Sequence, residues 1–168
     1  MNILEQSYQV PFASNMIHAK KWHTDAVDHA LAPIILMHDS LGCVALWRDF
    51  PARLAQVTAR VVYAYDRLGF GLSDASTQPL AHSFVITEAE QTFKAVLDYF
   101  SIQNFVILGH SVGGGMSVAI AAAYPERCQG LISISAQYAV EALTLAGISE
   151  AKVGFQQAGQ MERLEKYH

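Results

Sequence analysis

Four short apolar runs, separated by helical patterns, constrain the fold of this chain more than any other feature. The runs are continuous rather than alternating, which is typical of strands buried on both faces of a sheet. They span residues 33–38, 60–65, 104–108 and 130–135. Helical spacing of apolar residues lies between them, over residues 45–56, 84–101 and 112–124. Strands that alternate with helices pair in parallel through right-handed crossovers, so the pattern predicts an α/β fold.

The two ends of the chain depart from this alternation. Residues 6–12 and 15–23 have the pattern of two strands joined by a turn, which makes the sheet antiparallel at its first strand. After the fourth run, residues 138–146 and 149–167 predict two helices separated at Gly147. The expected architecture is a mostly parallel sheet flanked by helices on both faces, followed by a helical segment.

Composition excludes several classes of protein. With 168 residues, 52% hydrophobic and 15% charged, the chain is long and apolar enough for one domain and is not a disordered protein. The net charge is −4 and no basic cluster is larger than Lys20-Lys21, so nucleic acid is not an expected partner. Cys43 and Cys128 favour buried side chains in a reducing compartment over a disulfide framework. No apolar run reaches the ~18–20 residues of a membrane span and no signal-peptide pattern is present, so we expect a cytoplasmic protein without a membrane partner.

The strongest motif is Gly109-His110-Ser111-Val112-Gly113, between the third apolar run and the helical pattern that follows it. A nucleophile elbow requires this strand–turn–helix setting, because its serine occupies a sharp, strained turn that the flanking glycines permit. The first N–H groups of the next helix are placed to stabilise a developing oxyanion. The alternative is a glycine-rich structural turn, whereas a phosphate loop is disfavoured because no Lys-Ser/Thr pair follows the glycines.

Two further motifs follow the first two runs. They are His38-Asp39-Ser40-Leu41-Gly42 and Asp66-Arg67-Leu68-Gly69-Phe70-Gly71-Leu72-Ser73. Because sites in an open α/β sheet form outside the carboxyl ends of its strands, one crevice can collect all three motifs.

In order and spacing, the three motifs resemble those of the α/β-hydrolase fold family. H-D-S-L-G is similar to its H-G-x oxyanion loop, D-R-L-G-F-G-L-S to its D-x-x-G-x-G-x-S loop, and G-H-S-V-G-G to its nucleophile elbow. The resemblance implies that residues 1–136 are the N-terminal part of a hydrolase core. Residues 137–168 would then be the start of a helical cap, or lid.

Carried onto this sequence, the resemblance implies that Ser111 is the nucleophile. The backbone N–H groups of Val112 and Ser40 would be the oxyanion donors. Asp39 stands where the family usually has glycine, which leaves Leu41 as the neighbouring candidate for the second donor. A carboxylate beside an oxyanion is unfavourable unless it points away or is paired.

Other polar residues are expected to have structural roles. We expect His38, Asp66 and Arg67 to brace their loops, and His110 to pack or to bond the backbone. The remaining histidines show no metal-ligand spacing, so no metal is predicted: His18, His23, His29 and His82. The resemblance implies no cofactor.

The resemblance also implies an acid and then a histidine after the serine. After Ser111 the acids are all glutamates, and the only later histidine is His168. We therefore expect the chain to be truncated within the helical cap, and neither Glu141 nor His168 to approach Ser111.

The implied function is a serine hydrolase that cleaves a small-molecule ester or related acyl bond through an acyl-serine intermediate. Thioester, lactone and carbon–carbon bonds remain open, whereas the serine disfavours the dehalogenase and epoxide-hydrolase branches, which use a carboxylate at this position. Two alternatives remain, a non-catalytic ligand-binding member of the family and an inactive fragment.

Overall fold

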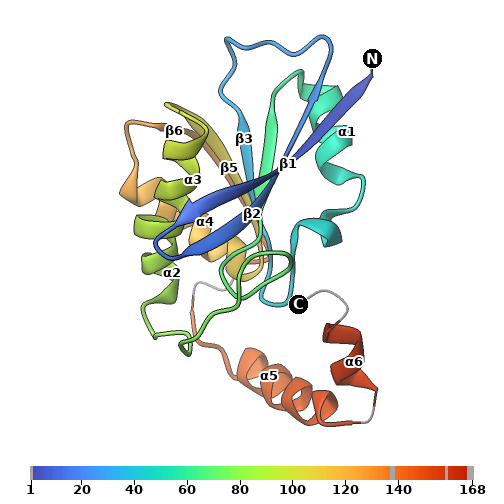
Figure 1. Cartoon of the computed structure of the whole chain (residues 1–168). Helices are drawn as coiled ribbons and strands as arrows, with labels where there is room; N and C mark the ends of the chain where they lie inside the picture. The colour runs from blue at the N-terminus through green and yellow to red at the C-terminus, as the bar shows by residue number, and fades with distance from the viewer. Residues whose placement is uncertain (1, 137–138, 158, 166–168) are drawn as a thin grey trace.

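The computed structural model is a six-stranded sheet with helices on both faces (Figure 1). It describes residues 2–136, 139–157 and 159–165. The strands are β1 (Ile3–Phe12), β2 (Asn15–Thr24), β3 (Ile34–Met37), β4 (Val62–Tyr65), β5 (Phe105–His110) and β6 (Cys128–Ile134). Their order is β1-β2-β4-β3-β5-β6, and β2 pairs antiparallel with both of its neighbours while the other pairs are parallel. The predicted α/β fold with a mostly parallel sheet is confirmed, and β2 is the strand that runs against the rest.

Two apolar cores lie on opposite faces of the sheet. On one face, α1 (Phe50–Thr58) and the 3₁₀ helix η1 (Val44–Trp47) cover a cluster that includes Trp22 and Leu36. On the other face, α3 (Phe93–Tyr99) and α4 (Val112–Ala123) cover a cluster that includes Phe93 and Ile107. This two-sided cover explains why β3 and β4 are apolar along their whole length.

The helical patterns of the core are found, but two of them are interrupted. The expected helix at 84–101 consists of α2 (Phe84–Thr87), a π-helical turn η2 (Glu88–Thr92) and α3. The expected helix at 45–56 is split into η1 and α1 by Arg48, which has a φ of 52°. Apolar spacing reports which residues face the core, and it does not distinguish 3₁₀, α and π turns.

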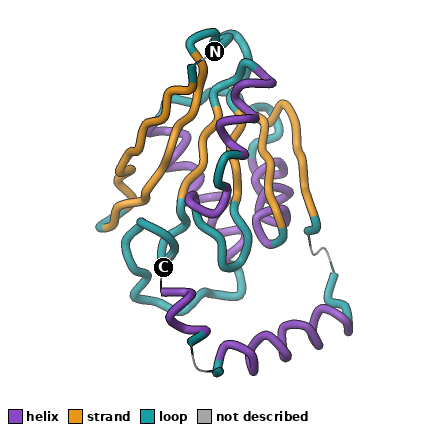
Figure 2. Tube along the Cα trace, turned by 90° about the vertical axis from the view of Figure 1, so that its right-hand side faces the viewer, coloured by secondary structure: helices purple, strands orange, loops and turns teal. Residues whose placement is uncertain are grey.

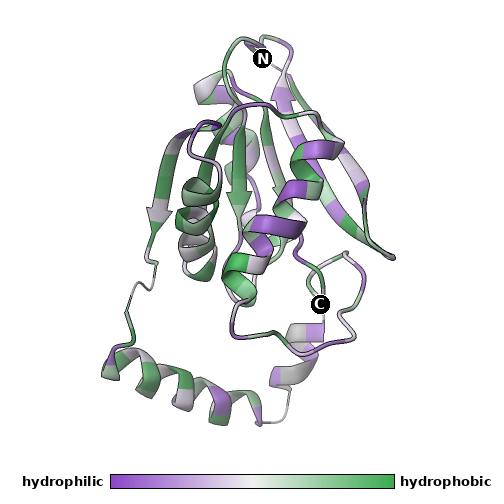
Figure 3. Ribbon diagram, turned by 90° about the vertical axis from the view of Figure 1, so that its left-hand side faces the viewer, coloured by the Kyte–Doolittle hydropathy of each residue, from purple (hydrophilic) through white to green (hydrophobic). Residues whose placement is uncertain are grey.

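The C-terminal helices are α5 (Ala142–Phe155) and α6 (Gln160–Glu165), which lie beyond the carboxyl ends of the parallel strands (Figures 2 and 3). The predicted break at Gly147 is wrong, because α5 continues through it. A glycine inside a helix costs only about 1 kcal/mol, and the Ser149 hydroxyl donates to the Leu145 carbonyl instead of starting a new helix. The domain boundary at residue 136 stays a prediction. No helix in the described part of the chain is long and apolar enough to cross a membrane.

Candidate active site

Ser111 occupies the sharp turn between β5 and α4. Its backbone has φ 55° and ψ −122°, a combination that non-glycine residues rarely adopt and that costs of order 1–3 kcal/mol. The surrounding bonds hold this turn, since the Ser111 N–H donates to the Ile134 carbonyl and the Ser111 carbonyl accepts from the Gly114 and Gly115 amides. Arg48 has nearly the same backbone angles and Ser135 also has a positive φ. It is therefore the strain together with the position between a strand and a helix that marks Ser111 as a functional candidate.

The flanking glycines are required by close backbone approach. A Cβ at Gly109 would meet the Gly113 carbonyl oxygen and the Ser117 hydroxyl. A Cβ at Gly113 would meet the carbonyl oxygens of Met37 and His38, well inside van der Waals contact. The first turn of α4 is therefore pressed directly against the backbone that leaves β3.

The turn at residues 38–42 lies beside this elbow because β3 and β5 are paired, with Met37 opposite Gly109. The hydrogen bonds of this turn bear on which amide, that of Ser40 or that of Leu41, is the second oxyanion donor. The Leu41 amide donates to Asp39 Oδ1 at 3.1 Å, which makes Leu41 the weaker candidate. Within the described residues, the Ser40 and Val112 amides donate to no protein acceptor. The assignment of Ser40 and Val112 as oxyanion donors stays a prediction.

Asp39 and His110 form a contact that the sequence did not indicate. Asp39 Oδ2 lies 3.5 Å from His110 Nδ1, and both side chains are partly exposed. With Leu46 and Trp47 they line a cavity of about 210 Å³. The Asp39 carboxylate thus lies beside an imidazole, and its other oxygen accepts from the Leu41 amide. His110, which we expected to pack or to bond the backbone, instead faces this carboxylate.

His38 braces the 38–42 turn, as expected, whereas Arg67, which we expected to brace its own loop, braces this turn as well. The Arg67 backbone N–H donates to His38 Nε2 at 3.1 Å, so Nδ1 carries the ring proton and donates to the Asp39 carbonyl at 2.8 Å. The Arg67 guanidinium donates to the same carbonyl at 2.7 Å and lies 4.2 Å above the Phe70 ring. Both ring nitrogens of His38 are therefore engaged in bonds that hold the 38–42 turn.

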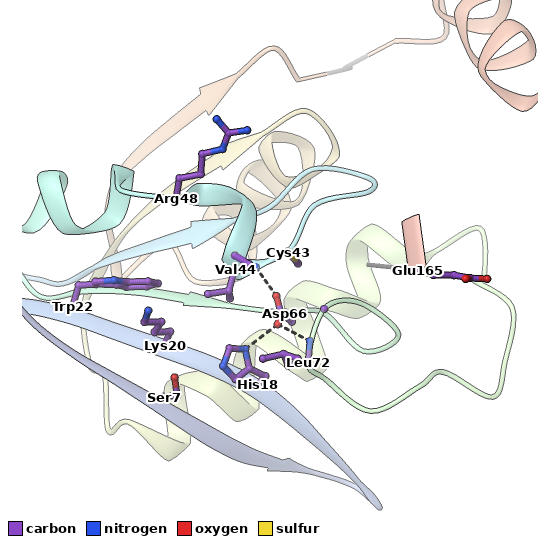
Figure 4. A pocket seen from close by; sticks show the side chains of 12 residues that line it. Ser7, His18, Lys20, Trp22, Cys43, Val44, Arg48, Asp66, Leu72 and Glu165 are labelled. Carbon is purple, nitrogen blue, oxygen red and sulfur yellow. Dashed lines mark hydrogen bonds and ion pairs between the residues drawn. The ribbon is translucent and has the colours of Figure 1, made fainter. Parts of the chain in front are cut away.

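Asp66 organises the second loop through bonds that span distant segments. Its carboxylate, which is 1% exposed, accepts from His18 Nδ1 at 2.8 Å and from the Val44 and Leu72 amides. His18 and Asp66 line a cavity of about 480 Å³ between η1 and β2, together with Lys20 (Figure 4). The expectation that Asp66 braces its loop is confirmed. The partner His18, 48 residues away, was missed because sequence spacing carries no signal for it.

Glu88, on the π-helical turn η2, is a buried acidic residue that contacts β4. The Tyr65 hydroxyl donates to Glu88 Oε1 at 2.6 Å. Burial raises the pKa of Glu88 above its ordinary value, and the bond from Tyr65 and the charge of Arg67 oppose that rise. Burial likewise lowers the pKa of Arg67, against the attraction of Glu88.

A general base for Ser111 is not found among the described residues. Within residues 2–136, 139–157 and 159–165, the Ser111 hydroxyl has no hydrogen-bond partner, and Glu141 makes no side-chain bond to it. His168 lies outside the described residues. In the same part of the chain, no cluster of His, Cys, Asp or Glu has the geometry to hold a metal.

Comparison with known proteins identifies the family. The model of the alpha/beta hydrolase fold matches residues 32–166. The chain belongs to the alpha/beta hydrolase fold family. This confirms the resemblance inferred from the three motifs, and with it the class of α/β-fold hydrolases.

Two curated relatives and one solved structure illustrate how far the likeness extends. This hydrolase-fold chain is 30% identical over 132 residues to abhydrolase domain-containing protein abhd-5.2 of Caenorhabditis elegans, covering 77% of the chain and 29% of that protein. It is 29% identical over 102 residues to the (lyso)-N-acylphosphatidylethanolamine lipase of Bos taurus, covering 61% of the chain and 29% of the lipase. The proline iminopeptidase structure from Mycobacterium smegmatis superposes with a TM-score of 0.70 at 22% identity, over 94% of this chain and 58% of that one. The matched part of the hydrolase-fold chain therefore covers less than a third of the length of these curated relatives.

Proposed function

We propose that this protein is a serine hydrolase that cleaves an ester or related acyl bond of a small molecule through an acyl-serine. The observation that carries the proposal is the strained backbone of Ser111, at φ 55°, on the turn between β5 and α4. Family membership and the name of the Bos taurus lipase support acyl chemistry. The proposal includes a cytoplasmic location and no cofactor.

In the proposed reaction, Ser111 Oγ attacks the acyl carbonyl and its proton passes to a base. The carbonyl oxygen becomes an oxyanion, which the N–H groups of Val112 and Ser40 stabilise. Collapse of this intermediate expels the leaving group and leaves the acyl group on Ser111. Water then attacks the acyl-serine and releases the acid.

A fluorophosphonate tests this proposal, and added imidazole replaces the base that the described residues do not provide. Ser111 Oγ forms a bond to phosphorus, the P–F bond breaks, fluoride leaves, and imidazole takes the serine proton. We expect one adduct by intact mass, located on Ser111 by peptide mapping and absent from Ser111→Ala. Ser135→Ala is the matched control, because Ser135 also follows a strand with a positive φ, of 51°. No adduct with or without imidazole, or an equal adduct on Ser111→Ala, would refute the proposal.

A second candidate function is ligand binding without catalysis. It is favoured by the absence, among the described residues, of a partner for the Ser111 hydroxyl. Adduct formation at Ser111 with imidazole but no ester turnover in its absence would favour this candidate for the chain.

A further inference from the structure

The second oxyanion donor belongs to a peptide unit whose other side is tightly held. The Ser40 N–H and the Asp39 carbonyl are parts of the same peptide bond, which is trans like every described bond of the chain. In a trans peptide the N–H and C=O point in opposite directions within one plane. Whatever fixes the Asp39 carbonyl therefore fixes the direction of the Ser40 N–H.

Three donors hold that carbonyl: two side chains at short distances, and the Gly42 backbone N–H at 3.3 Å. The Arg67 guanidinium donates to Asp39 O at 2.7 Å, and His38 Nδ1 donates to it at 2.8 Å. A carbonyl oxygen has two lone pairs, and the two short side-chain bonds occupy them, whereas the Gly42 bond is longer. One of the two side-chain donors is cationic, and hydrogen bonds from charged groups are shorter and stronger than neutral ones.

The guanidinium is itself held from several directions. Arg67 is 3% exposed, and its ion lies 4.2 Å above the Phe70 ring. Its Nε contacts His38 Nε2 at 3.3 Å, so the arginine and the histidine brace each other. Glu88 attracts the guanidinium from the buried side. Arg67 thus has little freedom to leave the Asp39 carbonyl.

We propose that Arg67 is a positioning residue of the oxyanion site, which aims and polarises the Ser40 N–H by donating to the carbonyl of the same peptide. The inference rests on the proposed function, because the direction of the Ser40 N–H matters only if this N–H stabilises an oxyanion. Arg67 is 3% exposed, so we assign it no contact with substrate.

The physical effect has two parts. Without the guanidinium, the Asp39–Ser40 peptide loses its cationic anchor, and the exposed Ser40 side of the turn can rotate its N–H away from Ser111. In addition, hydrogen bonds in a chain strengthen one another, so a donor at the carbonyl makes the N–H of the same peptide a better donor. Both parts weaken oxyanion stabilisation when Arg67 is replaced.

The test compares Arg67→Met with Arg127→Met. Methionine keeps a flexible apolar stem and removes every donor. Arg127 is a matched control, because its guanidinium also donates to backbone carbonyls, those of Ile102 and Gln103, and lies over the Tyr124 ring. It does so next to the start of β6, at the opposite end of the strand from Ser111.

Two readouts separate this inference from the proposed function. The first is the amide ¹H–¹⁵N resonance of Ser40 in the folded protein, which requires no reaction. We expect an upfield proton shift and faster hydrogen exchange in Arg67→Met, and no change in Arg127→Met. The second is the rate of Ser111 phosphonylation by a fluorophosphonate with imidazole. We expect Arg67→Met to slow it by about tenfold to a hundredfold, since loss of one oxyanion donor costs ~10²–10³ in rate.

Replacement of Arg67 leaves Glu88 without its counter-charge. The double variant Arg67→Met/Glu88→Gln removes that uncompensated acid and is compared with the single variant. If neither variant melts cooperatively, Arg67→Lys decides, because lysine keeps the charge but lacks the fixed fork of donors. An unlabelled wild type would refute the proposed function and leave the resonance test intact. A folded Arg67 variant with the wild-type Ser40 resonance, or with the wild-type labelling rate, would overturn the inference.

Discussion

Asp66 offers a prediction about stability that follows directly from its bonds. Its carboxylate is 1% exposed and accepts from a ring nitrogen on β2, from the first residue of η1 and from the loop after β4. Replacement by alanine removes the acceptor for all three donors at once. We therefore expect Asp66→Ala to destabilise the fold far more than a typical substitution.

The magnitude follows from what each donor is left with. The Val44 amide is buried, so its loss of a partner costs about 1–3 kcal/mol. The Leu72 amide belongs to an exposed residue and can regain water, and His18, 6% exposed, loses a bond to a charged group. Together these give roughly 3–5 kcal/mol, a large part of the ~5–15 kcal/mol by which domains are stable. Asp66→Asn retains one acceptor oxygen in the same shape, and we expect about 1–3 kcal/mol.

The assay is equilibrium urea denaturation at neutral pH, followed by far-UV circular dichroism. Asp98→Asn is the control, because Asp98 forms an exposed ion pair with Lys94, and exposed pairs contribute little to stability. The expected order of destabilisation is Asp66→Ala, then Asp66→Asn, then Asp98→Asn. A loss below about 1 kcal/mol for Asp66→Ala would show that water replaces the carboxylate and that the reasoning from unsatisfied donors is wrong.

Three further predictions concern other parts of the chain. Gly113→Ala should destabilise by about 1–3 kcal/mol or more and abolish Ser111 labelling, because its Cβ would strike the carbonyls of Met37 and His38; thermal melting and adduct mass check this. Burial raises the pKa of Glu88 in the folded state, so its stability contribution is complete below the unfolded pKa and is lost as pH rises through the folded pKa. The free energy of unfolding of Glu88→Gln should therefore improve relative to wild type from about pH 4 upward, and equal slopes in urea titrations between pH 4 and 8 would contradict this. Burial also raises the pKa of the Cys43 thiol. In the folded protein an aromatic disulfide reagent should therefore modify the partly exposed Cys128, and Cys43 should react only after unfolding.

The sequence was sufficient for the strands and the elbow because their signals are local. Continuous apolar runs specify β3 and β4, and glycines two before and two after Ser111 specify a turn with close backbone contacts. The π turn at Glu88–Thr92 was not predicted, because apolar spacing of three and four fits α and π turns alike. At Gly147 a local signal was misleading, since an exposed helix tolerates one glycine.

The contacts around the candidate site could not be predicted, because they join residues far apart in the chain. Asp39 faces His110 only because β3 and β5 are neighbours in the sheet, although 60–65 lies between them in sequence. Asp66 meets His18 because β2 folds back antiparallel onto β4. The sequence alone does not show which carboxylate will contact which imidazole.

The π turn of residues 88–92 also has an evolutionary consequence. A π turn closes each hydrogen-bonded loop over one residue more than an α-helix, so it accommodates an extra residue without displacing α2 and α3. Deleting one residue of this turn would therefore restore a continuous α-helix with α2 and α3 still in place. Glu88 belongs to the turn, so a deletion that removes it would leave the buried Tyr65 hydroxyl without the carboxylate to which it donates at 2.6 Å. A one-residue gap in this segment and the loss of the glutamate should therefore occur together among relatives of this chain.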